Sequence, residues 1–365
     1  MSSIPLRDAR RVSLATRDEL VPFSTAYANK TKEQLVADYR SDVGSCRLVN
    51  ERTPPKDWQS GAVRVVQWNV KNLCDPDGMR QGDQEFADAI FGLDADIVVL
   101  QECGRARDRI YDHTSRVGQL AGKLFAAGFE IFPVGVDMPI LLATRLPVEF
   151  FEAVPLDRDF YGSGRFVAAF AQLSLRGGRR VGVYGIHLNH HCRDHRGARL
   201  DQIRALLRHA KERVHPDTPL IVVGDFNQQR RRDYHPLEWQ HLVTSMNQRG
   251  EPLDDGVCYQ LEVADFTCCL DSPQAARNWS SDQPPPLTHW TGTIVDYAFA
   301  RNLKLQGVFV EPRLVSDHLP VVTDWTFGEE RPAKRFCCSR RSPWNSVSAL
   351  LERWLWCRAP RMNLP

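Results

Sequence analysis

The chain has 365 residues, enough for one large domain or two small ones, and its hydrophobic (42%) and charged (25%) fractions are ordinary for a globular protein. Lys and Arg (47) nearly balance Asp and Glu (45), so the net charge of +2 gives no general case for binding nucleic acid. No stretch approaches the roughly 18 apolar residues that a membrane-spanning helix needs, which argues against an integral membrane protein.

The termini and the cysteines indicate where the protein works. The first residues lack the apolar core of a secretory signal peptide, and the ten cysteines include no Cys-x-x-Cys pair. Reduced thiols are the simplest interpretation. We therefore expect an intracellular protein, of the cytoplasm or the nucleus, and a monomer.

The first 61 residues mix charges and prolines around one helix-like stretch, residues 31–40, and predict a partly ordered extension. A strand pattern starts at Ala62 and runs to Val70. A helix with an apolar face follows near residues 86–93, and then a second buried strand, 95–102, which ends in Glu102.

The middle of the chain continues this alternation. Helices are expected at residues 115–127 and 200–214, the second being the clearest amphipathic helix in the chain. Strands are expected at residues 130–136, 140–144, 166–175, 181–187 and 220–223. The last of these is Leu-Ile-Val-Val, and it stops at a glycine.

The remaining segments are less regular. Residues 228–290 show little periodicity and predict long surface loops, followed by a strand at 293–299 with Asp296 inside it, a short strand at 308–312 and a last strand after His318. The tail, 328–365, predicts a short amphipathic helix. Its paired cysteines, Cys337 and Cys338, lie close to arginines, so the tail could make a peripheral membrane contact. It could equally dock onto the domain or stay disordered.

Strands and helices that mostly alternate fit two mixed β-sheets packed face to face with helices outside, an α/β (α+β) fold. One domain over residues 62–327 would hold this arrangement and is long enough for a sizeable core.

Polar residues recur where the predicted strands end. Any one of them is weak evidence, and the pair Asp225 and Asn227 alone could be a simple Asx-type turn. Together they supply carboxylates, carboxamides and imidazoles, the groups that metal-assisted phosphoryl transfer uses, and their hard oxygens suit Mg²⁺ or Mn²⁺. The residues are Asn69, Glu102, His187, Asn189, Asp225, Asn227, Asp296, Asp317 and His318.

Six short motifs resemble, in order and in spacing, those of the endonuclease/exonuclease/phosphatase superfamily. They are Gln67-Trp-Asn-Val70, Leu100-Gln-Glu102, His187-Leu-Asn189, Gly224-Asp-Phe-Asn227, Val295-Asp-Tyr297 and Ser316-Asp-His-Leu-Pro320. The resemblance implies a four-layered α/β sandwich and a divalent-metal-dependent hydrolase of phosphate esters.

The resemblance also implies a role for each motif. Glu102, supported by Asn69, would form the main metal site, and Asp317 would bind metal directly or through water. Asp225 would orient and deprotonate the attacking water, which Asn227 would help to hold. His318, oriented by Asp296, and His187 would contact the scissile phosphate. Asn189 and Arg165 would bind substrate, although Arg165 could also be an ordinary surface arginine.

The motifs fix the reaction more firmly than the substrate. Inositol 5-phosphatases carry a Trp-x-Cys-Asp-Arg-style signature where this chain has Ile-Val-Asp-Tyr, so a 5-phosphatase is less expected. A plain Val-Asp-Tyr resembles nucleases, sphingomyelinases and deadenylases, and a nuclease that acts on DNA or RNA is the leading expectation. Two arginine clusters, 105–109 and 230–232, could bind flanking phosphates, and aromatics within 228–290 could stack on bases. Solvated loops and ordinary packing are the alternatives.

Two other functions stay open. The first is a sphingomyelinase-like or inositol-phosphate-type phosphohydrolase at a membrane surface. The second is a catalytically silent scaffold, which the complete set of polar residues disfavours. The crowded sequence His190-His-Cys-Arg-Asp-His195 could bind a metal ion, but a solvated loop is the simpler interpretation.

Overall fold

The computed structural model describes the greater part of residues 56–327. The described residues are 56, 61–74, 82–104, 110, 112–135, 139–156, 166–175, 177–190, 197–234, 236–249, 256–272, 285–289, 292–311, 313 and 315–327. The tail after residue 327, the first 60 residues apart from Lys56, and Arg165 lie outside this set. The predicted extension, tail helix and domain limits therefore stay predictions.

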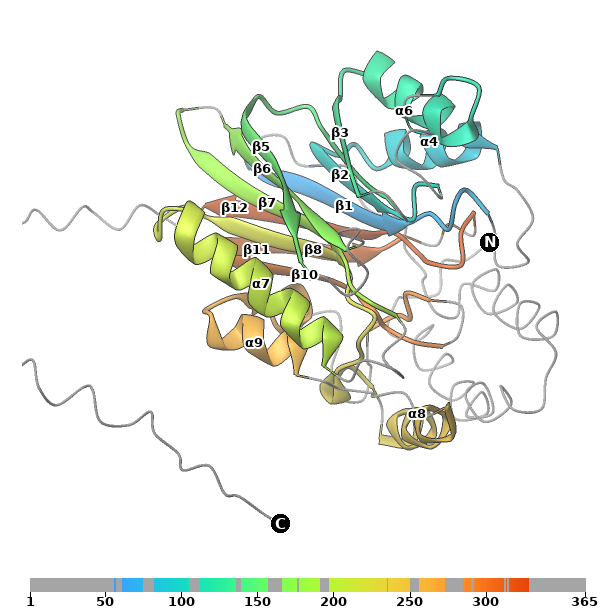
Figure 1. Cartoon of the computed structure of the whole chain (residues 1–365). Coiled ribbons are helices and arrows are strands. Elements are labelled where there is room, and N and C mark those ends of the chain that lie inside the picture. The colour runs from blue at the N-terminus through green and yellow to red at the C-terminus, as the bar shows by residue number, and fades with distance from the viewer. Residues whose placement is uncertain are drawn as a thin grey trace, which may run out of the picture. The chain divides into compact units, whose positions relative to one another are not determined.

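The described strands form two sheets of six strands each (Figure 1). The first sheet has the order β11-β12-β1-β2-β4-β3, with β1 Val63–Asn69, β2 Ile97–Gln101, β3 Glu130–Val134, β4 Ile140–Thr144, β11 Leu303–Val310 and β12 Val321–Phe327. The second has the order β5-β6-β7-β8-β10-β9, with β5 Val148–Pro155, β6 Val167–Ser174, β7 Arg180–His187, β8 Leu220–Asp225, β9 Thr267–Cys268 and β10 Asp296–Arg301.

Each sheet has one parallel pair at its centre, β1 with β2 and β7 with β8, and antiparallel pairs elsewhere. Central strands are buried on both faces, which is why they are near-continuous apolar runs in the sequence. Both sheets are mixed, and the predicted fold class is confirmed.

Two hydrophobic layers follow from the alternation of side chains along β1. Val63 and Val65 belong to the core that joins the two sheets, whereas Val66 and Trp68 point to the other face and pack with helix residues such as Phe86. Helices α4 (Asp83–Gly92) and α6 (Arg116–Ala126) lie over that outer face of the first sheet (Figure 1).

The second sheet is covered from outside by α7 (Ala198–Arg213) and α9 (Val257–Val263) (Figure 1). Helices, sheet, sheet and helices give four layers. No helix among the described residues has the length and apolar character to span a bilayer.

The alternation along β1 also positions the site. Gln67 and Asn69 follow Val63 and Val65 on the face that meets the second sheet, yet both are polar and fully buried. The apolar layer between the sheets therefore gives way to polar side chains at the carboxyl end of β1.

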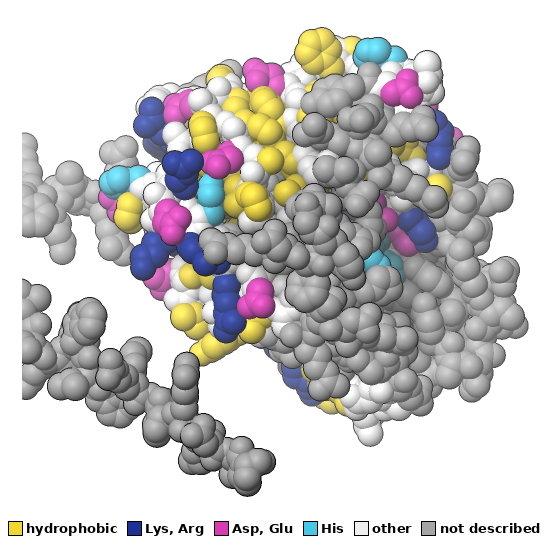
Figure 2. Space-filling view, in the orientation of Figure 1, with side chains coloured by type: hydrophobic (Ala, Val, Ile, Leu, Met, Phe, Trp, Pro, Cys, Tyr) yellow, Lys and Arg dark blue, Asp and Glu magenta, His cyan; other side chains and the backbone are white. Residues whose placement is uncertain are grey.

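Three sequence expectations need correction. Residues 228–290 are not only loops, because they contain α8 (Pro236–Arg249) and α9. Asp296 is the first residue of β10 rather than an interior one. Strand β5 was not expected; it is the outer strand of its sheet and exposes Phe150. Figure 2 shows hydrophobic side chains gathered on one face of the molecule.

Candidate active site

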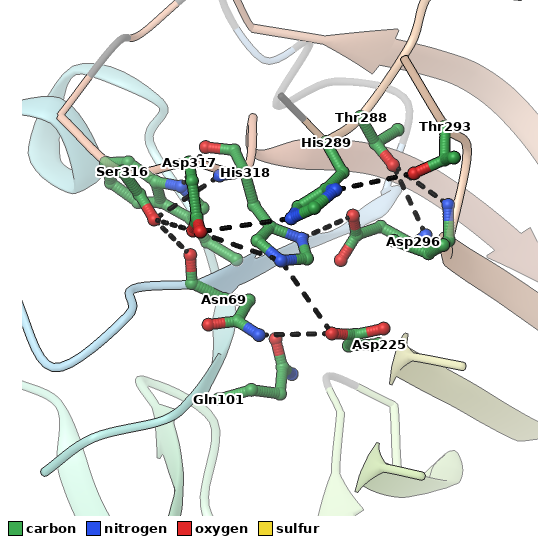
Figure 3. A network of polar contacts seen from close by, with 12 residues as sticks. Asn69, Gln101, Asp225, Thr288, His289, Thr293, Asp296, Ser316, Asp317 and His318 are labelled. Carbon is green, nitrogen blue, oxygen red and sulfur yellow. Dashed lines mark hydrogen bonds and ion pairs between the residues drawn. The ribbon is translucent and has the colours of Figure 1, made fainter. Parts of the chain in front are cut away.

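The sheet register brings the predicted residues together at one edge of the molecule. In the second sheet, His187 of β7 lies opposite Asp225 of β8, and Asp225 lies opposite Asp296 of β10, so three titratable groups form a row across neighbouring strands. In the first sheet, Asn69 lies opposite Gln101, one residue before Glu102. Figure 3 shows side chains from both sheets converging.

Asp225 is the best-positioned carboxylate of this group. It is 1% exposed. Its Oδ1 accepts a hydrogen bond from the backbone N–H of Asn227 (2.8 Å), and its Oδ2 accepts one from Nδ2 of Asn69 (3.1 Å). Bonds from two different segments fix the plane of the carboxylate, so its direction is set before any substrate arrives.

The glycine before Asp225 is required by close packing. Gly224 has φ +153°, and a Cβ there would lie 2.0 Å from the carbonyl oxygen of Ile186 in β7. Only glycine allows the parallel strands to approach so closely at the point where the acid leaves the sheet. Asn227 then adopts a left-handed conformation (φ +50°), and its Nδ2 donates to the carbonyl of Leu188 (2.9 Å).

His318 and Asp296 form the second fixed unit. Nδ1 of His318 lies 2.8 Å from Oδ2 of Asp296, whose Oδ1 accepts a hydrogen bond from Nε2 of Gln67 (2.6 Å). Nε2 of His318 lies 3.9 Å from Oδ2 of Asp225. The contact with Asp296 holds the imidazole so that its second nitrogen faces the same region as Asp225 (Figure 3).

The charges of the two units support different roles. Burial, together with the neighbouring Asp296 carboxylate, raises the pKa of Asp225 to about 6 against the pull of His318 and His187. Burial by itself would lower the pKa of His318, but Asp296, Asp225 and Asp317 outweigh it and raise that pKa to about 10. At neutral pH, Asp225 can accept a proton and His318 carries one.

Glu102 offers a carboxylate at the rim of the site. Its backbone has φ +53°, its side chain is 20% exposed, and its Oε1 accepts a hydrogen bond from Nδ2 of Asn69 (3.0 Å). Burial would raise the pKa of Glu102, but His187, 3.8 Å away, Asn69 and His318 hold it below its usual value. An ionised, partly accessible carboxylate fits a hard divalent cation, and Asn69, which turns its Nδ2 toward this carboxylate, positions it.

The carboxylate of Asp317 lies close to one lysine and two histidines. Its Oδ2 lies 2.5 Å from Nζ of Lys71 and 3.8 Å from Nε2 of His289, and its Oδ1 lies 4.0 Å from Nε2 of His318. Burial raises the pKa of Asp317 although His318 and Lys71 oppose that shift.

Lys71 and His289 were not singled out from the sequence. Lys71 stands in a turn after β1, outside any strand, and His289 stands in a segment read as a surface loop. The only available signal was proximity to a motif, since Lys71 follows Gln67-Trp-Asn-Val70 directly.

The turn that carries Lys71 is strained. Lys71, Asn72 and Leu73 have φ of 43°, 56° and 57°, a left-handed conformation that side chains disfavour. Leu73 is fully buried, and Nη1 of Arg116 donates to its carbonyl oxygen (2.9 Å). Because packing and this hydrogen bond hold the turn in place, the amine of Lys71 is held against Asp317 at the site.

Of the two predicted substrate contacts, Asn189 and Arg165, the structure describes only Asn189. The backbone N–H of Asn189 donates to Oε1 of Gln202 at 3.0 Å, next to His187. Arg165 lies outside the described residues, as do arginines 105, 107 and 109. The roles assigned to all of these remain predictions.

The arginine cluster 230–232 was expected to be either solvated or in contact with phosphates. The structure shows that one of its three arginines is buried instead. Arg230 is 3% exposed, and its guanidinium pairs with Asp233 (2.6 Å) and Asp271 (2.7 Å). Arg232 pairs with Glu262 and, at 3.5 Å, with Asp271. Arg230 is therefore a structural residue, because its charge is already balanced in the interior.

The described aromatics within 228–290 mostly pack. Tyr234 and Phe266 are buried, and Trp239 lies against Tyr234 with the ring centroids 5.8 Å apart. Tyr259, 62% exposed, is the described one that could meet a base.

Comparisons with known proteins agree with the motifs. The sequence model of the Endonuclease/Exonuclease/phosphatase family matches residues 66–318, which include the motifs from Asn69 to His318. No curated protein matches the chain significantly.

Solved structures share the fold at low identity. An endonuclease/exonuclease/phosphatase from Beutenbergia cavernae is 21% identical over 73% of this chain and 72% of its own, with a TM-score of 0.50. ANGEL2, a 2′,3′-cyclic phosphatase, is 15% identical over 72% of this chain and 95% of its own, with a TM-score of 0.52. A mannosyl-6-phosphatase of Bacteroides thetaiotaomicron is 15% identical over 73% of this chain and 100% of its own, with a TM-score of 0.50.

These likenesses concern the fold alone, and their substrates differ. The family match spans more than half of the chain and every strand end that contributes to the site. This chain belongs to the endonuclease/exonuclease/phosphatase family, whose members hydrolyse phosphate esters.

Proposed function

We propose that this member of the family is a divalent-metal-dependent phosphodiesterase that acts on nucleic acid. The observation that carries the proposal is the arrangement of Asp225 and the His318–Asp296 pair, in which a base and a protonated imidazole face the same region with 3.9 Å between Oδ2 and Nε2. An attacking water and a phosphoryl oxygen are the two partners that these groups would need.

In this mechanism Asp225 takes the proton of the attacking water, because its pKa of about 6 leaves it ionised yet basic near neutral pH. Asn227, held next to it, supports the water. The imidazolium of His318 donates to a phosphoryl oxygen and stabilises the charge that develops there, while Asp296 keeps its Nδ1–H engaged. His187, opposite Asp225 in the sheet, is a second donor.

Glu102 and Asn69 would hold the metal ion, Mg²⁺ or Mn²⁺. Such an ion, when bound, polarises a phosphoryl oxygen and offsets negative charge on the leaving group. The ionised carboxylate of Glu102 supports this assignment, and Asn69 positions that carboxylate by donating from Nδ2 to Oε1 (3.0 Å), while its own oxygen accepts from the backbone N–H of Lys71 (3.0 Å). Asp317 would add a further carboxylate through a bound water.

The substrate class rests on residues around the orienting acid. Val295-Asp296-Tyr297 lacks the tryptophan, cysteine and arginine of the 5-phosphatase signature, and the hydroxyl of Tyr297 is committed to Asp233 (3.0 Å). Because Arg230 is buried and paired with acids, it is not counted as a phosphate contact, and the argument for nucleic acid from basic patches is weaker. The motif therefore disfavours an inositol phosphate, and nucleic acid stays our leading substrate class, with a lipid headgroup as the alternative.

One substrate panel tests the proposal. Purified protein with Mg²⁺ or Mn²⁺ is offered plasmid DNA, oligo(A) RNA, sphingomyelin and inositol phosphates, with His318→Ala as the inactive control. We expect cleavage of at least one nucleic acid by the wild type and none by the control. Release of product from only the lipid or only the inositol phosphates would overturn the substrate class while leaving the hydrolytic chemistry intact.

A further inference from the structure

Two imidazoles and one carboxylate form a cluster beside the site that the proposed function does not use as a unit. They are His289, Asp317 and His318, whose ligand atoms all lie within 4.8 Å of one another. Isolated β-bridges link His289 to Thr293 and to His318, so the backbone fixes the two histidines side by side, and their ring centroids are 4.4 Å apart (Figure 3).

We infer that these three residues form a second metal site, which takes a transition-metal ion of the Zn²⁺ type rather than Mg²⁺. The inference goes beyond the proposed function, because it concerns binding of an ion and does not require that the chain hydrolyse any substrate. Binding of the ion displaces the proton from Nε2 of His318, so the metal-bound form is an alternative to the protonated form that the proposed function uses and not a step in that reaction.

The distances fit such an ion. Nε2 of His289 lies 3.8 Å from one oxygen of Asp317, and Nε2 of His318 lies 4.0 Å from the other. Ligand atoms about 2.0–2.2 Å from a tetrahedral Zn²⁺ lie roughly 3.4 Å from one another. Because the three ligand atoms lie within 4.8 Å of one another, side-chain shifts of about 1 Å would close the cluster around an ion, with water at the fourth position.

The partners of the other ring nitrogens support the same assignment. Nδ1 of His318 is bonded to Asp296 (2.8 Å), and Nδ1 of His289 contacts Oγ1 of Thr293 (3.4 Å). Histidines that bind metals usually donate one ring nitrogen to a carboxylate or another oxygen, which fixes the ring and leaves the second nitrogen for the ion. In both rings it is Nε2 that faces Asp317.

The donor set selects against Mg²⁺. Two imidazole nitrogens and one carboxylate suit Zn²⁺, Co²⁺ or Ni²⁺, whereas Mg²⁺ prefers an octahedron of oxygens. The oxygen-rich pair Glu102 and Asn69 offers the harder site. One chain would thus hold two neighbouring positions with different metal preferences.

Lys71 occupies part of the same space. Its amine lies 2.5 Å from Oδ2 of Asp317 and balances that charge, and its side chain is 26% exposed. An incoming divalent ion would displace the amine toward solvent. Removing the amine should therefore strengthen binding of the ion, an effect opposite to that of removing a ligand.

The experiment measures Zn²⁺ directly. The full chain is stripped with a chelator, and Zn²⁺ is titrated in excess Mg²⁺ against a chromogenic competitor, without substrate. The variants are His289→Ala, Lys71→Met and the matched control His215→Ala, whose side chain is 74% exposed on another part of the surface. Circular dichroism confirms that each variant is folded.

We expect the wild type and His215→Ala to bind alike, His289→Ala to bind at least about tenfold more weakly or to lose one equivalent, and Lys71→Met to bind more tightly. Other histidines, such as those at 190, 191 and 195, could add sites, so the comparison between the two histidine variants is the diagnostic one. Equal binding by His289→Ala and His215→Ala would overturn the inference, as would weaker binding by Lys71→Met.

The position of the ion gives a test that needs no variant. Crystals of the wild type soaked in Zn²⁺ should show an anomalous peak about 2.0–2.1 Å from Nε2 of both His289 and His318. Peaks confined to other places would contradict the site. Failure of the substrate panel would leave either result unchanged, so the two proposals fail separately.

Discussion

The central residue of the site is Asp225, a buried carboxylate whose surroundings in the folded protein favour its neutral form. Asp225 is buried next to Asp296, and its pKa of about 6 lies above the value near 4 of an unfolded chain. The folded state therefore loses stability as pH rises from about 4 through about 6, because the ionised form is the disfavoured one. Function near neutral pH depends on that less stable form.

The substitution Asp225→Asn separates the role of Asp225 as a base from its effect on the stability of the fold. We expect kcat to fall about 10²–10⁴-fold, because the general base is gone. The melting temperature at pH 8 should be at least that of the wild type, because the amide carries no buried charge. Steady-state kinetics and thermal melts measure both. A variant that keeps full turnover would refute the base assignment.

The pH dependence of kcat/KM should be bell-shaped. The acid limb reports Asp225 and should lie no higher than about 6, because a nearby cation can only lower that pKa; the alkaline limb reports loss of the proton from His318, near about 10. Asp296→Asn removes the carboxylate that raises the pKa of His318, so its alkaline limb should move to lower pH. An unmoved alkaline limb would contradict the pairing.

The residues that could be singled out from the sequence are those at or just after the end of a strand. Asn69, Glu102 and Asp225 close buried apolar runs, and a polar residue at such an end has few structural explanations. His289 and Lys71 were missed, because nothing in their neighbourhood along the chain fixes their direction. Only the β-bridge of His289 to His318, and the strained turn that holds Lys71, bring them to the site.

At the scale of elements, the close pair β7–β8 makes the geometry possible. Gly224→Ala would place a Cβ 2.0 Å from the carbonyl oxygen of Ile186, so one of the strands must move. We expect a loss of at least about 2 kcal/mol of unfolding free energy and of most activity. Gly122→Ala, in α6 with no atom within 4 Å of the added Cβ, is the control and should be neutral or slightly stabilising. Urea denaturation measures both.

Arg230 links the segment after β8 to the end of η4, the 3₁₀ turn Cys269–Asp271. Arg230→Ala leaves the buried Asp233 without its guanidinium partner, and we expect it to lower the unfolding free energy by about 3–5 kcal/mol. The neighbouring Arg231→Ala removes an exposed side chain and should change stability by less than about 1 kcal/mol. Similar stability of the two variants would show that the ion pairs of Arg230 contribute little.

Strands and helices could be predicted from the sequence where they are buried in the fold. Strands β2 and β8 lie at sheet centres, and their continuous apolar runs admit few other interpretations. Strand β5 mixes exposed and half-buried positions at a sheet edge and leaves no clear period. Helix α8 does carry Trp239, Leu242, Val243 and Met246 at helical spacing, and this signal was missed within a segment rich in Gly, Pro and Asp. Burial of Arg230 was equally hidden, since a run of arginines usually indicates a solvated face.

At the scale of the molecule, the fold does not require the metal ion. The two sheets and their helices bury a continuous core, and the candidate ligands stand at its edge. We expect thorough chelation with EDTA to abolish turnover, to leave the far-ultraviolet circular dichroism unchanged and to lower the melting temperature by only a few degrees. Added Mg²⁺ should restore activity. Turnover that survives chelation would rule out the proposed chemistry.

The hydrogen bond between Gln67 and Asp296 joins residues 229 positions apart, one from each sheet. Neither sheet alone holds a base, an oriented imidazole and a metal ligand. A chain with only one sheet formed therefore lacks part of the site, and we expect it to be inactive until the two sheets have packed against each other.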